Sequence, residues 1–78
     1  MIIFDKNFFR KDLSKAFMVG VNLVCVDMRS ANLSGADMRG VNLTGADLTD
    51  ANLNGVNLSG ADLMGVKWPK GWKLVRDE

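Results

Sequence analysis

Apolar residues recur every five positions between residues 21 and 65. Each block of five begins with Ala or Val, continues with Asn or Asp, has Leu or Met at its centre and usually ends in Gly. An α-helix of about 3.6 residues per turn would scatter the central residues around its axis, and a flat strand would place them alternately on its two faces. Looser copies extend the pattern over residues 6–70. The period therefore predicts a chain that turns once in every block and aims each central side chain at a shared interior.

The positions within a block have different predicted roles. In an extended chain the first and central residues point to one side and the second residue points outward. The turn then falls on the fourth and fifth residues, where Gly adopts a left-handed backbone at little cost. Cys25, Ser30 and Asp50 replace Gly at this position, which leads us to expect more than one form of turn. The predicted core consists of Met28, Leu33, Met38, Leu43, Leu48, Leu53, Leu58 and Leu63.

This repeat resembles that of the pentapeptide-repeat protein family, and the ending VKWPKGW resembles the tail of many members, notably cyanobacterial ones. The resemblance implies an all-β fold, a right-handed quadrilateral parallel β-helix in which four blocks make one coil. The chain would then form about three coils with capped ends, stacked at the strand spacing of about 4.8 Å. We divide it into an N-terminal leader or cap (1–5), a pentapeptide-repeat β-helix (6–70) and a C-terminal tail or cap (71–78).

The ends of such a solenoid need protection because they expose backbone groups and an open core. Near the C-terminus Trp68 takes a central position, Pro69 cannot donate a hydrogen bond to another coil, and Trp72 can lie across the opening. We interpret these three residues as an end cap rather than as a platform on which nucleic-acid bases stack.

Several outward positions hold apolar residues where the repeat elsewhere has polar ones. These exceptions are Phe9, Phe17, Val19, Val24 and Met64. All but Met64 fall in the first coil, and clustered exposed apolar residues usually mark a contact. Phe9, Phe17, Val19 and Val24 are therefore our candidate interaction surface. Two alternatives stay open: the leader covers Phe17, Val19 and Val24 as a cap, or the repeat has drifted.

The composition excludes two kinds of site that depend on cysteine. Cys25 is the one cysteine and the chain has no histidine, so neither an internal disulfide nor a cysteine–histidine zinc site can form. We expect the outward Asn and Asp residues to hydrogen-bond the backbone or each other. No catalytic, metal-binding or cofactor-binding residue and no cofactor is predicted. The net charge of +1 argues against a nucleic-acid partner and a membrane surface. Because neither a signal peptide nor an apolar run of membrane-spanning length is present, we expect a cytoplasmic protein.

Our prediction is a non-catalytic structural or protein-interaction module, a small β-helical rod. Its partner would be an unknown protein, or a second copy of the chain bound through the first coil. The family resemblance raises one alternative, a DNA mimic that inhibits or protects a DNA-binding enzyme such as DNA gyrase. The short length and near-neutral charge of this chain disfavour that alternative.

Overall fold

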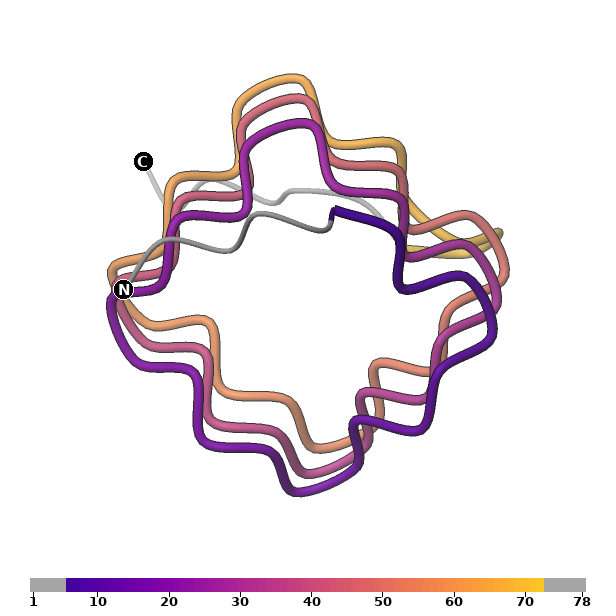
Figure 1. Cartoon of the computed structure of the whole chain (residues 1–78), viewed down its shortest axis with the longest axis horizontal. Helices are drawn as coiled ribbons and strands as arrows, with labels where there is room; N and C mark the ends of the chain where they lie inside the picture. The colour runs from indigo at the N-terminus through magenta and orange to yellow at the C-terminus, as the bar shows by residue number, and fades with distance from the viewer. Residues whose placement is uncertain (1–5, 73–78) are drawn as a thin grey trace.

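The computed structural model describes residues 6–72, which wind into a four-sided parallel β-helix. Neither an α-helix nor a continuous strand occurs in this range. Instead, the second residue of each block forms an isolated parallel β-bridge with the residue twenty positions further on, from Asn7 with Asp27 to Asp47 with Lys67. Seen along the solenoid, successive coils lie on one another around a roughly square outline (Figure 1). The predicted fold class is confirmed.

Blocks twenty residues apart stack and form the four faces of the solenoid. The three full coils are residues 6–25, 26–45 and 46–65, and residues 66–70 begin a fourth. Face 1 consists of blocks 6–10, 26–30 and 46–50; face 2 of 11–15, 31–35 and 51–55; face 3 of 16–20, 36–40 and 56–60; and face 4 of 21–25, 41–45 and 61–65. Faces 1 and 3 therefore lie on opposite sides of the rod.

Backbone hydrogen bonds join neighbouring coils in one repeating pattern. On face 3, the central Met18 N–H donates to the carbonyl of Asp37 (2.8 Å) and the Gly20 N–H donates to the carbonyl of Arg39 (2.9 Å). The Asp37 N–H donates in return to the carbonyl of Ala16 (2.9 Å). Because the other faces repeat these three bonds between coils 1 and 2 and between coils 2 and 3, the stacked coils satisfy one another's backbone groups.

Every corner of the three coils has the same backbone angle at the fifth residue of the block. Its φ is left-handed throughout, from 58° at Cys25 to 72° at Gly45, and Ser30 and Asp50 fall in this range at 59° and 62°. A hydrogen bond from the next block closes each corner, as when the Ala46 N–H donates to the carbonyl of Leu43 at 2.9 Å. The sequence led us to expect more than one form of turn, whereas this angle is alike at every corner of the three coils.

The interior is filled by the central residues and by the Ala or Val that begins each block. Six of the predicted core residues, from Met28 to Leu53, are at most 2% exposed. Leu58 and Leu63 are partly buried and pack against this core from the third coil. They are less covered because only residues 66–72 of the described chain lie beyond them.

The predicted end cap lies at the C-terminal end of the described chain. Trp68 is half-buried against the core, Pro69 is buried and Trp72 is exposed. The leader (1–5) and residues 73–78 of the predicted tail lie outside the described residues. Within residues 6–72 the chain forms no helix long and apolar enough to cross a membrane.

Candidate functional site

The outward second residue of a block stabilises its own turn. The side-chain oxygen of Asn32 accepts a hydrogen bond from the Ser34 N–H (3.0 Å), and Asn42 does the same for the Thr44 N–H (3.1 Å). The Thr44 hydroxyl also donates to the Asn42 side chain at 2.7 Å. This contact is an Asx turn, in which a short polar side chain caps the backbone two residues on. The interpretation of the Asn and Asp residues as backbone partners is confirmed.

The Asn and Asp residues do not gather into a metal site in the described part of the chain. No group of three or more His, Cys, Asp or Glu residues there is placed to hold a metal ion.

Hydrogen bonds lower the pKa of several aspartates in these turns. For Asp47 the largest cause is the Thr49 hydroxyl, followed by the Thr49 backbone N–H, while Lys67 and Arg29 lower the pKa further through their charge. For Asp27 the guanidinium of Arg29 has the largest effect on the pKa. In the folded protein these groups therefore favour their ionised form.

We expect acid to destabilise the protein through these aspartates. Because the folded pKa of Asp47 lies below its ordinary value of 3.8, its contribution is complete above that value and is lost as the pH falls through the folded pKa. Asp47→Asn keeps an oxygen for the turn but cannot titrate. The urea midpoint of this variant should therefore fall less than that of the wild type between about pH 6 and about pH 2.5. Equal decreases in the two midpoints would contradict the proposed role of Asp47.

Faces 1 and 3 each carry an arginine–aspartate pair two residues apart in the second coil. Arg29 bonds both carboxylate oxygens of Asp27 at 2.9 Å, and Arg39 bonds both oxygens of Asp37 at 2.8 Å. Both arginine side chains are about half exposed. Exposed ion pairs contribute roughly 0–1 kcal/mol to stability, so these pairs mainly set the local charge pattern.

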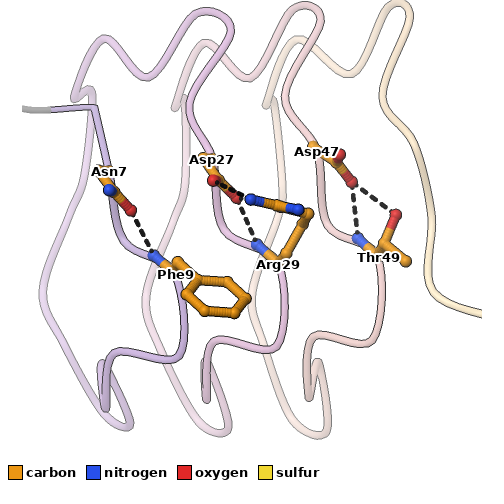
Figure 2. A network of polar contacts seen from close by, with 6 residues as sticks. All are labelled: Asn7, Phe9, Asp27, Arg29, Asp47 and Thr49. Carbon is orange, nitrogen blue, oxygen red and sulfur yellow. Dashed lines mark hydrogen bonds and ion pairs between the residues drawn. The ribbon is translucent and has the colours of Figure 1, made fainter.

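Phe9 already has a partner within the chain. The guanidinium carbon of Arg29 lies 5.0 Å from the centre of the Phe9 ring, a cation–π contact between the first and second coils of face 1. Figure 2 shows Arg29 between the Phe9 ring and the Asp27 carboxylate, with the Asp47–Thr49 turn in the next coil. The contact with Arg29 gives Phe9 a role in the rod itself, although 45% of its surface is exposed.

Phe17 is the most exposed large apolar residue described, with 76% of its surface accessible. It is also the one second-position residue of the three coils that is neither Asn nor Asp. An Asx turn therefore cannot form at this block, and within residues 6–72 no side chain caps the Val19 N–H. Val19, which lies beside Phe17 on face 3, is 42% exposed.

The candidate interaction surface predicted from the sequence does not form one patch. Phe17 and Val19 are neighbours on face 3, but Phe9 lies on the opposite face 1. Val24 is half-buried on face 4, beyond the corner formed by Gly20. The four residues share one coil, but a coil consists of four blocks that lie on four different faces of the rod.

Two residues of this region were missed by the sequence analysis. Asp37 stacks on Phe17 through a β-bridge, and Arg39 stands two residues further along, in line with Val19. The exposed apolar pair and the ion pair thus share face 3. A twenty-residue step from Phe17 and Val19 would have identified both.

The model of the family described as pentapeptide repeats matches the chain in 8 copies, over residues 7–40 and 31–67. No curated protein sequence matches the chain.

Solved structures that match the chain include three cyanobacterial pentapeptide repeat proteins. HetL from Nostoc sp. strain PCC 7120, described as involved in the regulation of heterocyst differentiation, has 22% identity and a TM-score of 0.50 over 85% of this chain and 46% of its own. A second Nostoc protein has 26% identity and a TM-score of 0.33, covering 87% of this chain and 78% of that one. A protein from Cyanothece 51142 has 30% identity and a TM-score of 0.32, covering 80% and 56%.

The chain thus spans less than half the length of HetL, and this likeness concerns the fold alone. The family model, by contrast, matches most of the described residues. Together with the five-residue period and the four-sided coil, this match shows that the chain belongs to the pentapeptide repeat family, whose members form right-handed quadrilateral β-helices.

Proposed function

We propose that the protein is a non-catalytic interaction module that binds a protein partner through face 3 at its first coil. The observation that carries this proposal is Phe17, an exposed aromatic ring at a position that holds Asn or Asp in every other block of the three coils.

Phe17 has two costs for the isolated fold. It gives up the hydrogen bond of the Asx turn, and a net contribution of about 0.5–1.5 kcal/mol is typical of such a bond. It also leaves most of an aromatic ring in water. Residues that break a local rule without a gain to the fold are expected at functional sites. A partner that covers the ring would account for the residue.

The rest of the rod supports binding rather than catalysis. Its interior is packed with Leu, Met, Ala and Val, and none of the described buried residues is polar or charged. Catalysis would need polar groups that converge on a substrate in a concave site. The outward Asn and Asp oxygens are instead engaged with the chain's own backbone.

The DNA-mimic alternative finds no specific support on the described surface. A mimic of duplex DNA needs a continuous negative face, but Asp27 and Asp37 are each neutralised by an arginine. Lys67 follows Asp47 in the outward column of face 1. We therefore retain one proposed function.

The test of this proposal replaces Phe17 with the residue that the repeat prefers. Phe17→Asn should leave the protein folded and raise the free energy of unfolding by up to about 1 kcal/mol, because an Asx turn can now form. Urea unfolding followed by circular dichroism measures this change.

The immobilised wild-type chain is exposed to cell extract, and the proteins that it retains are identified. Immobilised Phe17→Asn should not retain these proteins. Phe9→Ser, which removes a ring from the opposite face, should keep them. Purified candidates are then titrated against both variants. If Phe17→Asn binds every such candidate as tightly as the wild type, face 3 is not the contact and the proposal is wrong.

A further inference from the structure

Face 3 carries two outward columns of residues whose chemistry matches coil by coil. The second-position column is Phe17, Asp37 and Asn57, and the fourth-position column is Val19, Arg39 and Ser59. Each coil thus presents a like or complementary pair: two apolar side chains, then an acid and a base, then an amide and a hydroxyl. We propose that the partner of face 3 is a second copy of this chain, docked face to face about a two-fold axis parallel to the solenoid axis. This inference rests on the proposed function and names its partner.

The symmetry decides which residues would meet. A two-fold axis that runs along the face, parallel to the solenoid, places the second-position column of one copy against the fourth-position column of the other at the same coil. Phe17 then meets Val19 of the second copy, and Asp37 meets Arg39 of the second copy. Such a contact is isologous, so every pair occurs twice.

The charges select this orientation over the reverse one. An in-plane two-fold axis perpendicular to the solenoid would place Asp37 against Asp37 and Arg39 against Arg39 of the second copy. Like charges at an interface disfavour that alignment, whereas the parallel arrangement extends each Asp37–Arg39 pair into a four-membered network. The guanidinium has donors left for a second carboxylate, because five N–H groups are available and the pair within the chain uses only two nitrogens.

The other three faces lack the combination of an apolar pair and an ion pair. On face 1 the axis would bring Asn7 against Phe9, whose ring also lies under Arg29. On face 4 it would bring Asp62 against Met64 of the second copy. Face 2 offers polar pairs in all three coils, such as Asn32 with Ser34, but neither an apolar pair nor a described ion pair. Face 3 is the described face that combines an apolar pair, an ion pair and a polar pair.

The corners of face 3 allow a close approach. Gly20, Gly40 and Gly60 form one corner and carry no side chain that could project from it. At the other corner Gly35 and Gly55 follow Lys15, whose stem lies back along the rod at 3.4 Å from the Cβ position of Gly35. Bulky corner side chains therefore do not hold two copies of face 3 apart.

The expected association is weak. Three coils span only about 15 Å along the solenoid, so one face buries less than the roughly 800 Å² per partner of a standard interface. Phe17 supplies the apolar anchor, and the charges set the orientation. We expect a dimer in reversible exchange with monomer, with a dissociation constant between about 10 µM and 1 mM.

The decisive experiment uses two variants of opposite charge. Arg39→Asp gives face 3 two acids and Asp37→Arg gives it two bases, so each variant alone should self-associate at least about tenfold more weakly than the wild type. An equimolar mixture should recover dimers, because the acids of one copy then face the bases of the other. Sedimentation equilibrium up to about 1 mM chain measures all three samples.

Matched controls separate docking from damage to the fold. Arg29→Asp breaks the equivalent ion pair on face 1 and should dimerise like the wild type. Phe17→Asn restores the repeat, is expected to fold at least as well as the wild type and should remain monomeric. Circular dichroism verifies that each variant is folded before its association is compared.

Three results would overturn the inference: a wild-type monomer at every concentration, a mixture that stays monomeric, or equal losses from Arg29→Asp and Arg39→Asp. If the wild type is a monomer at every concentration and still binds a foreign protein that Phe17→Asn does not bind, the proposed function stands and the self-association does not. If neither a second copy nor a foreign protein depends on Phe17, both proposals are wrong.

Discussion

Leu43→Ala is expected to destabilise the protein by about 2–5 kcal/mol, which is a large part of the 5–15 kcal/mol available to a typical small domain. Leu43 is 1% exposed and stacks between the central residues Leu23 and Leu63 of face 4. Removing its side chain costs the transfer of the lost methyl groups and leaves a cavity. The stacked backbone cannot collapse into this cavity without breaking hydrogen bonds between coils. Urea unfolding followed by circular dichroism measures the loss.

Leu63→Ala is the matched control for this core prediction. It makes the same change in the same column, but Leu63 is only partly buried in the third coil. Its loss should be clearly smaller, because the third coil is covered by fewer described residues. Equal losses at Leu43 and Leu63 would contradict the burial gradient that the structure shows.

Ala46→Lys is expected to prevent folding at neutral pH. Ala46 is fully buried in the inward first-position column of face 1, which runs from Lys6 through Val26 to Val66. An ammonium group there would have no described polar partner in the interior, and burying such a charge without one costs several kcal/mol even after the structure relaxes. Far-UV circular dichroism and near-UV tryptophan signals of the variant should be those of an unfolded chain.

Lys6 provides the control for the buried lysine. It occupies the same column in the first coil, where it is exposed. Lys6→Ala should therefore change the free energy of unfolding by no more than about 0.5 kcal/mol, as for most surface substitutions. A folded Ala46→Lys variant with a wild-type urea midpoint would show that the interior of the rod is not closed.

The local rules of this protein could be read from the sequence. The five-residue period excluded a helix and a flat strand, and it identified the central Leu and Met residues as core. The Asn and Asp residues were expected to serve the backbone, and Asn32, Asn42 and Asp47 do so through hydrogen bonds two residues on. These properties depend on contacts within one block, which is why a single chain sequence reveals them.

The candidate site was harder to predict because it depends on contacts between blocks. Phe9 and Phe17 looked alike as exposed aromatic residues of the first coil. The structure gives Phe9 a cation–π partner in Arg29 and leaves Phe17 exposed beside Val19 on another face. The spacing alone does not show that the Arg29 guanidinium contacts the Phe9 ring of the first coil, because this contact depends on the side-chain conformation of Arg29.

The sequence by itself determined the repeating unit, the residues that fill the interior and the positions at which the pattern is broken. The tertiary structure decided which of these positions share a face and which already have a partner within the chain. Four blocks close one coil through backbone hydrogen bonds, so residues twenty positions apart become neighbours, while Phe9 and Phe17 come to lie on opposite sides. A periodic sequence predicts the same local structure in every block. The face of the rod on which a residue lies is decided only when four blocks close a coil.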